Sequence, residues 1–273
     1  MKSTPSPYEA PLVAFDFSPL RDAVWKDAGA LQSRDLGLGK ASGGEIGARN
    51  LRSPDGAPIE QWPDTDDSVF RMLFLLSGTL TFDVEDGRTA TLSKFDAIHL
   101  PLLERARNFR FADDFEAMDI RVPNFESALG PGDFSSIFQF DAPVGNDLGI
   151  NRETPGNYQT GKGPRSFMRY RDLGSQGQTN GRIHIHLVKV DGAAPAGGTG
   201  WHYHSMGQLF YVLTGNGEIS AVTRDIIPIG AGDAMCIGAG MLHNVSSFSS
   251  DYSVIELCLP ADYDTIPASP PPA

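Results

Sequence analysis

An internal repeat constrains the possible fold more than any other feature of this sequence. The segment FRMLFLLSGTLTF in the first half matches GQLFYVLTGNGEI in the second half when Gly78 is laid on Gly215. Further along, residues 95–97 (FDA) fall on residues 232–234 (GDA). Two matches in the same order predict a tandem duplication. The 273 residues are therefore expected to form two domains of similar architecture.

The apolar segments are short and alternate with period two, which is typical of strands and not of helices. RIHIHLVKV alternates strictly, and TLTFDV alternates before a turn at residues 85–88. The chain also contains 30 glycines and 20 prolines, more turn residues than a helical protein of this length needs. We predict an all-β protein built from two barrels.

Composition excludes several classes of partner. The formal net charge is −12 and no run of Lys or Arg is visible, so a nucleic-acid partner is disfavoured. No segment approaches the ~20 consecutive apolar residues of a membrane span, and the N-terminus lacks the apolar core of a secretory signal. Cys236 and Cys258 are too few for a disulfide framework. We expect a cytoplasmic protein with free thiols and a small-molecule substrate.

Changes in periodicity suggest the domain limits. Between residues 123 and 164 the alternation fades, and the segment becomes rich in Gly, Asn, Pro and Thr. We predict five parts, namely an N-terminal arm (1–44), a first barrel (45–125), a linker (126–165), a second barrel (166–264) and a disordered tail (265–273).

Histidines are concentrated in the second half, where five of the six occur. His202 and His204 are two residues apart on a predicted strand, so their side chains point to the same side. Gln208 opens the next strand, and His243 arrives from a distant strand when a barrel closes. Three neutral imidazoles are a common ligand set for first-row metals and leave coordination positions open.

These residues lie in two segments that resemble the motifs of the cupin superfamily. Residues 200–215 contain His-x-His, then Gln208, then six residues and Gly215, as in the first cupin motif. Residues 232–243 resemble the second motif, which ends in His243. The resemblance implies tandem barrels of the RmlC-like jelly-roll type, the double-stranded β-helix. It also implies one divalent metal per chain, bound by His202, His204, Gln208 and His243.

The sequence departs from the family pattern at the fourth ligand. Gln208 stands where a Glu is usual. Three imidazoles and an amide are all neutral, so the charge of a dication would stay uncompensated, which favours a strong Lewis acid over an electron donor. Fe(II) is the metal that the resemblance favours, with Mn(II), Ni(II), Co(II) or Zn(II) as alternatives. The resemblance also implies a homo-oligomer, namely a dimer.

The first barrel lacks the corresponding imidazoles. The alignment places Thr65, Asp67, Arg71 and Ala106 at the positions of His202, His204, Gln208 and His243. We therefore expect a degenerate barrel without a metal, serving dimerisation, folding or closure of the pocket.

Three functions remain open at this level. The first is a dioxygenase that acts on an enol, phenol or diketone chelated to a three-histidine centre. The second, favoured by Gln208, is a redox-neutral lyase, isomerase or decarboxylase of hydroxy or keto acids. The third is a non-catalytic cupin that binds a small molecule. His184, His186 and Tyr211 are candidates for catalytic residues, although a structural role is an equal alternative for the two histidines and Tyr211 fits the core better.

Overall fold

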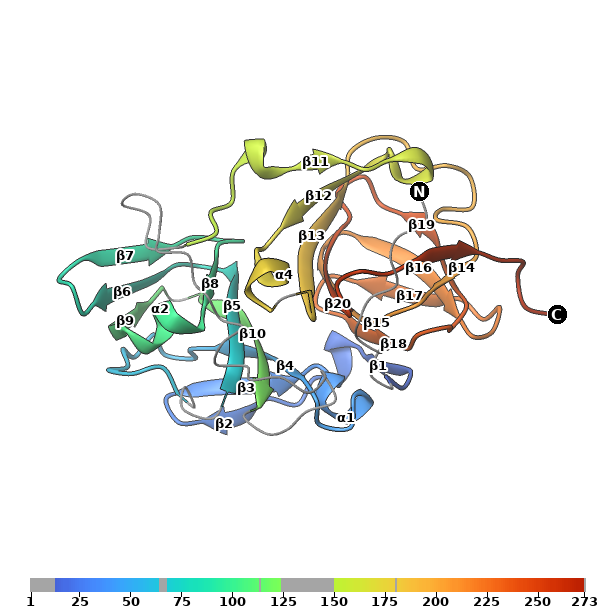
Figure 1. Cartoon of the computed structure of the whole chain (residues 1–273). Coiled ribbons are helices and arrows are strands. Elements are labelled where there is room, and N and C mark those ends of the chain that lie inside the picture. Colours follow the sequence, from blue (N-terminus) through green and yellow to red (C-terminus); the bar gives the residue numbers. More distant parts are fainter. Residues whose placement is uncertain (1–12, 64–67, 113, 124–149, 180, 273) are drawn as a thin grey trace.

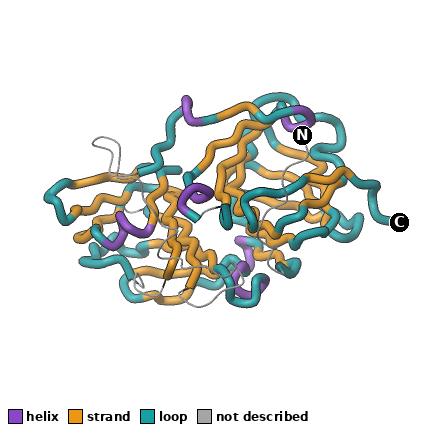
Figure 2. The backbone as a smooth tube through the Cα atoms, viewed as in Figure 1, coloured by secondary structure: helices purple, strands orange, loops and turns teal. Residues whose placement is uncertain are grey.

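The computed structural model consists of two β-barrels joined side by side (Figure 1). It describes residues 13–63, 68–112, 114–123, 150–179 and 181–272. Strands dominate both halves, with only short helical turns between them (Figure 2). The predicted all-β tandem barrel is confirmed. Within the described residues, no helix has the length and apolar character that a membrane crossing requires.

The first barrel packs a six-stranded sheet against a three-stranded one. The larger sheet has the order β2-β3-β4-β10-β5-β8, and the smaller has the order β7-β6-β9. Its elements are β2 (Lys26–Ala28), β3 (Leu31–Asp35), α1 (Leu38–Ala41), β4 (Gly47–Arg52), β5 (Ser68–Ser77), β6 (Leu80–Val84), β7 (Thr89–Leu92), β8 (Ala97–His99), α2 (Leu100–Glu104), β9 (Ala106–Phe111) and β10 (Glu116–Pro123).

The second barrel has the same two-sheet plan, with more strands in each sheet. One sheet has the order β1-β18-β15-β20-β13-β12-β11, and the other has the order β17-β16-β19-β14-β21. Its elements are β1 (Asp16–Ser18), η1 (Leu20–Asp22), η2 (Pro155–Asn157), β11 (Gln159–Thr160), η3 (Gly163–Arg165), β12 (Met168–Asp172), α4 (Ser175–Gln178), β13 (His184–Val190), β14 (His202–His204), β15 (Gly207–Thr214), β16 (Asn216–Ala221), β17 (Ile227–Gly230), β18 (Ala234–Ile237), β19 (His243–Phe248), β20 (Ser253–Leu259) and β21 (Thr265–Pro267).

The glycines that align the two halves occupy equivalent tight turns. Gly78 connects β5 to β6, and Gly215 connects β15 to β16. Both have positive φ, 67° and 72° respectively. A Cβ atom would lie 2.9 Å from the Phe115 nitrogen at the first turn and 2.8 Å from the Tyr252 Cα at the second. Each turn thus requires glycine for conformation and for space.

The segments that precede each barrel pair with the opposite barrel. Strand β1 pairs with β18 of the second barrel, with Phe17 opposite Met235. In the reverse direction, Asn151 forms an isolated bridge to Ala97 on β8 of the first barrel. The predicted division therefore needs correction at 1–44, whose described part joins both barrels, and at 126–165, whose described part includes β11 in the second barrel. Residues 1–12 and 124–149 lie outside the described residues.

The predicted disordered tail (265–273) also needs correction. Residues 265–267 form β21, which pairs with β14 so that His204 is opposite Thr265. This strand is too short for its alternation to give a signal in the sequence, and its pairing partner lies far away in the chain. The pairing brings the C-terminal segment next to the two histidines of β14.

Two buried arginines join the barrels in matching ways. Arg34 donates from Nη1 to the Gly232 carbonyl at 2.7 Å, across to the second barrel. Arg171 donates from Nη1 to the Phe95 carbonyl at 2.7 Å, across to the first barrel. Both arginines precede the same Asp-Leu-Gly sequence, and their acceptors are the two residues that the alignment places together. The repeat therefore extends further than the two matched segments.

A shared apolar layer fills the space between the barrels. It combines residues from the outer face of the large sheet of each barrel, among them Phe74 and Met118 from the first and Ile185, Leu209 and Leu257 from the second. Alternation along the strands sends the neighbours of these residues into the barrel interiors. The interior faces carry an apolar cluster in each barrel, together with a few polar side chains.

The interior of the first barrel holds an ion-pair cluster. Arg71, on β5, forms two hydrogen bonds to Asp119 on β10, at 2.7 and 2.8 Å. Arg49, on β4, approaches the same carboxylate at 2.9 Å. Arg71 and Asp119 are fully buried. Ala106 is buried on β9, while Thr65 and Asp67 lie outside the described residues. Arg71 thus fills the position aligned with Gln208 with a permanent cation.

We expect Asp119→Asn to destabilise the protein strongly. The change keeps the size of the side chain but removes the charge that faces two guanidinium groups, and breaking a buried pair in this way costs about 3–5 kcal/mol. Urea unfolding measures the loss. Asp83→Asn, which removes an exposed carboxylate bonded to Arg110, is the control and should change stability little. Equal effects of the two substitutions would contradict this interpretation.

Candidate metal centre

Three histidines converge inside the second barrel. His202 and His204 lie on β14, and His243 opens β19 directly opposite His202 in the strand pairing. The ring centroids of His202 and His243 are 4.2 Å apart, and those of His204 and His243 are 5.2 Å apart. One nitrogen from each ring lies within 4.8 Å of the others. The three side chains that the sequence predicted as ligands are therefore together and buried.

Each imidazole is held through its Nδ1 atom. The partners are the Gly200 carbonyl for His202 at 2.7 Å, the Met241 carbonyl for His243 at 2.9 Å, and the Thr265 hydroxyl for His204 at 3.0 Å. The two carbonyls can only accept, so Nδ1 carries the proton in His202 and His243. This leaves Nε2 with a lone pair, the form in which a histidine binds a metal.

Burial keeps these histidines neutral. It lowers the pKa of His202 to about 4 and, helped by the neighbouring His202, the pKa of His243 to about 3. Burial also lowers the pKa of His204. The cluster therefore binds few protons near neutral pH and offers three unprotonated nitrogens to a cation.

Gln208 completes the cluster. It opens β15, is buried, and its Nε2 lies 3.2 Å from His243 Nε2. Its Oε1 atom is also buried and has no hydrogen-bond partner among the described residues. A buried amide oxygen without a partner is costly, and the two ends of the amide exchange by a simple rotation. A metal between the three imidazoles would satisfy this oxygen, so the residues present fit the predicted cation.

A cavity of about 150 Å³ opens beside the histidines. Its wall is largely apolar, with Phe210, Val254 and Tyr252 among the lining residues. The charged residues of its lining are Arg165, Lys189 and Glu256. Arg165 Nη2 lies 3.2 Å from His202 Nε2, and Glu256 contributes the carboxylate of the wall. The cavity is thus suited to a small molecule with one or more polar ends.

The predicted catalytic residues occupy two different environments. His184 and His186 point into the barrel, as their alternation predicted, but lie outside the cavity wall, behind Glu256. Tyr211 lies on the opposite face of its sheet, in the apolar layer between the barrels, and bonds to Asn50 at 2.8 Å. Tyr211 follows Gln208 by three positions, and an odd offset along a strand reverses the side. Its proposed place in the pocket is therefore wrong.

Several polar residues of the cavity were not predicted from the sequence, among them Glu256, Arg165 and Tyr263. Glu256 stands alone as a charge in the apolar strand YSVIELCLP, which was a signal for a functional or paired group. Its Oε2 accepts a hydrogen bond from His186 Nε2 at 2.7 Å. Burial opposes ionisation of Glu256, but this bond and the nearby imidazoles lower its pKa to about 2. Arg165 ends the short helical turn η3 and Tyr263 lies in an irregular segment, so neither gave a periodic signal.

Comparisons with known proteins agree with this architecture. Residues 192–258 match the cupin domain. The second barrel is a cupin domain, and the chain has the two-barrel cupin fold. No curated protein matches the sequence significantly.

Solved structures that resemble the whole chain include oxalate decarboxylases. A variant of the Bacillus subtilis enzyme has a TM-score of 0.58 and 14% identity, covering 95% of this chain and 81% of that one. The Lactobacillus farciminis enzyme in complex with formate has a TM-score of 0.56 and 13% identity, covering 92% of this chain and 88% of that one. Another Bacillus subtilis structure, described by its Mn(II) centres, has a TM-score of 0.55 and 13% identity, covering 95% and 81%. At this identity the likeness concerns the fold.

We expect the charge of residue 208 to control metal affinity. Gln208→Glu adds an anionic oxygen to the three neutral imidazoles and should tighten binding of Mn(II) or Co(II) about tenfold, whereas His202→Ala should weaken it about 100-fold or more. Titration of chelator-treated protein, monitored by Mn(II) electron paramagnetic resonance, measures both. Tyr211→Phe is the control and should bind as the wild type. Unchanged affinity in His202→Ala would remove the basis of this site.

Acidification should destabilise the metal-free protein. The folded pKa values of His202 and His243, about 4 and about 3, lie below the ordinary 6.5, so the unfolded chain binds more protons. Stability is then complete above about pH 7 and falls as the pH drops from 6.5 towards 4, by up to about 1.4 kcal/mol per pH unit for each histidine. Urea unfolding from pH 8 to 4 measures the slope. His243→Gln should reduce it, and an unaltered slope would contradict the assignment.

Proposed function

We propose that this protein is a metal-dependent enzyme that acts on a small carboxylate substrate without net oxidation, as a lyase, isomerase or decarboxylase. The observation that carries the proposal is the combination of a neutral ligand set with Arg165, whose guanidinium lies 3.2 Å from His202 Nε2. A divalent cation held by His202, His204, His243 and Gln208 would retain its full charge. Together with Arg165 it favours a substrate with two adjacent oxygen anions or an anion beside a carbonyl.

The ligand set also supports non-redox chemistry. When bound, the metal would act as a Lewis acid that withdraws electron density from the substrate oxygens. An anionic fourth ligand would reduce this effect, and Gln208 does not supply one. This is the alternative that Gln208 favoured in the sequence. The chemistry of the oxalate decarboxylases that share the fold supports it as well, and Mn(II), named for one of them, becomes the preferred metal in place of Fe(II).

The remaining residues of the cavity can bind and orient such a substrate. Arg165 would pair with a carboxylate through two parallel hydrogen bonds. Tyr170 lines the same cavity, and burial raises its pKa to about 12, so its hydroxyl keeps its proton and can donate a hydrogen bond. Glu256 is ionised and faces the cavity, which places a proton acceptor beside a substrate hydroxyl.

In a decarboxylation the bond between the carboxylate carbon and its neighbour breaks and carbon dioxide leaves. The electron pair stays on the neighbouring carbon, which then takes up a proton, so no oxidant is consumed. The apolar wall around Phe210 and Val254 favours this step, since a carboxylate loses hydration there and the neutral product does not.

The proposal is tested by following carbon dioxide release and oxygen uptake together. Metal-loaded protein is assayed against oxalate and against hydroxy and keto acids of two to four carbons. We expect turnover of at least one acid with oxygen uptake far below one molecule per turnover. Consumption of one oxygen molecule per turnover, with enols or diketones as the better substrates, would instead support the dioxygenase. Binding of an acid without any turnover would support the non-catalytic alternative.

The role of Arg165 has its own control. Arg165→Gln should raise KM for an anionic substrate about 10- to 100-fold, because a hydrogen bond between charged groups contributes about 1.5–3 kcal/mol. Arg169→Gln, which removes an exposed arginine paired with Asp191 on the outside of the barrel, should leave KM unchanged.

A further inference from the structure

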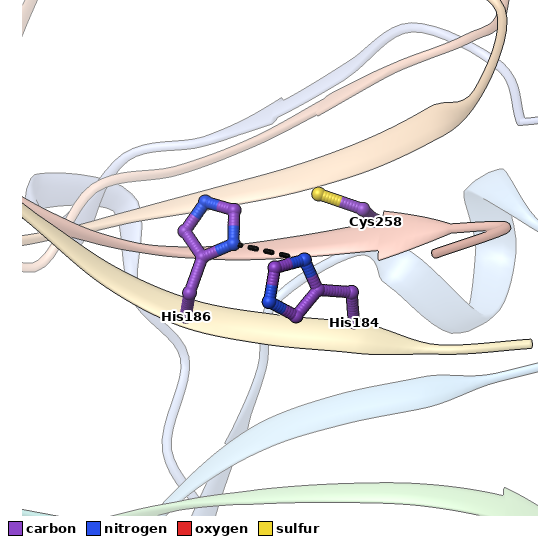
Figure 3. Close-up of side chains that lie close together, drawn as sticks. All are labelled: His184, His186 and Cys258. Carbon is purple, nitrogen blue, oxygen red and sulfur yellow. Dashed lines mark hydrogen bonds between the residues drawn. The ribbon is translucent and has the colours of Figure 1, made fainter. Parts of the chain in front are cut away.

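A second cluster of metal-binding side chains lies inside the second barrel, behind Glu256. It consists of His184 and His186 on β13 and Cys258 on β20, with His184 directly opposite Cys258 in the strand pairing. Their ligand atoms all lie within 4.8 Å of one another. Figure 3 shows the two imidazole rings facing each other, with the thiol beside them. His186 and Cys258 are buried.

Each of the two imidazole rings has a carboxylate near its Nε2 atom. Glu256 Oε2 accepts from His186 Nε2 at 2.7 Å. Asp172 Oδ1 lies 3.8 Å from His184 Nε2. The carboxylate of Glu256 holds the proton of His186 on Nε2, which leaves Nδ1 of His186 with a lone pair. The two Nδ1 atoms lie 3.3 Å apart, so this lone pair faces either a proton on His184 Nδ1 or a cation.

The spacing matches a tetrahedral centre. Two imidazole nitrogens bound to one zinc ion at about 2.0–2.1 Å lie about 3.3 Å apart, and a thiolate sulfur lies about 3.6 Å from each. The observed separation of the two Nδ1 atoms is 3.3 Å. The sulfur lies within 4.8 Å of a nitrogen of each ring, so it is near enough to become the third ligand if the side chains adjust on binding.

The first barrel has a carboxylate at the position of Glu256, and a comparison of the two shows which compensating charge Glu256 lacks. Strand register places Asp119 opposite Arg49 and Leu73, and Glu256 opposite His186 and Phe210. With Gly78 on Gly215, these two carboxylates are equivalent.

The groups that pair with these two carboxylates differ between the barrels. Asp119 pairs with Arg49 and Arg71, two permanent cations, whereas Glu256 pairs with His186. Among the described residues, no arginine or lysine forms an ion pair with Glu256. A buried carboxylate needs a compensating charge, and a cation bound by His184, His186 and Cys258 would provide it through His186.

We propose that His184, His186 and Cys258 bind a second metal ion, of the thiolate-preferring class represented by Zn(II). The thiolate and the Glu256 carboxylate together balance the two charges of the ion, in contrast to the three-histidine site, where the ligands are all neutral. Metal binding would release the thiol proton of Cys258, as coordinated thiols do. The inference does not depend on the reaction proposed for the three-histidine site.

Cobalt distinguishes the two sites because only one contains sulfur. Titration of chelator-treated protein with Co(II) should produce a thiolate-to-cobalt charge-transfer band in the near ultraviolet and saturate at two ions per chain. Cys258→Ser and His184→Ala should lose this band and one ion. His202→Ala should keep the band while losing the ion of the three-histidine site. An excess of Zn(II) should displace the bound Co(II) and abolish the band.

Cys236 provides the matched control. It is the other cysteine of the chain, buried on the outer face of β18, which β15 separates from β20, and Cys236→Ser should retain the band. Circular dichroism of every variant verifies folding. Saturation of the wild type at one ion without a charge-transfer band would overturn the proposal and identify the cluster as a hydrogen-bonded pair of histidines. A band that disappears in Cys236→Ser but persists in Cys258→Ser would overturn it as well.

Discussion

The apolar contact between the two barrels determines which side of each strand faces the interior. In β13, β15 and β20 the alternate residues Ile185, Leu209 and Leu257 belong to the shared layer. Period-two alternation then sends His186, Gln208 and Glu256 inwards. Each barrel also has an apolar cluster of its own, with Leu73 and Phe82 in the first and Val188 and Val254 in the second. The polar clusters lie beside these residues on the inward faces of the strands.

The two interiors solve the same electrostatic problem with different groups. Each contains a buried carboxylate at the equivalent position, Asp119 or Glu256. The first barrel compensates with two arginines, Arg49 and Arg71, which are permanent cations. The second has His186 and Gln208 at these positions, and neither is a permanent cation. A proton or a metal can therefore supply positive charge in the second barrel, so its interior can respond to ligands in a way that the first cannot.

Features that depend on local rules could be predicted from the sequence, whereas features that depend on long-range pairing could not. His202, His204 and His243 were identified because a two-residue spacing fixes the side of a strand, and the duplication was visible at Gly78 and Gly215. The same parity rule, applied to Tyr211, would have placed it outside the pocket. By contrast, β1 and β21 are short strands whose partners lie far away in the chain, and no local pattern reveals which edge a three-residue strand will join.

The hydrogen bonds of the three histidines explain why the metal-free cluster keeps its shape. Nδ1 of His202 and of His243 is fixed by a carbonyl two residues earlier, Gly200 and Met241, within the same turn. These local contacts form with the backbone and do not require a cation. His204 differs, because its partner Thr265 belongs to β21 at the C-terminal end. The orientation of this imidazole, and with it the third ligand, is therefore coupled to the docking of the last strand against β14.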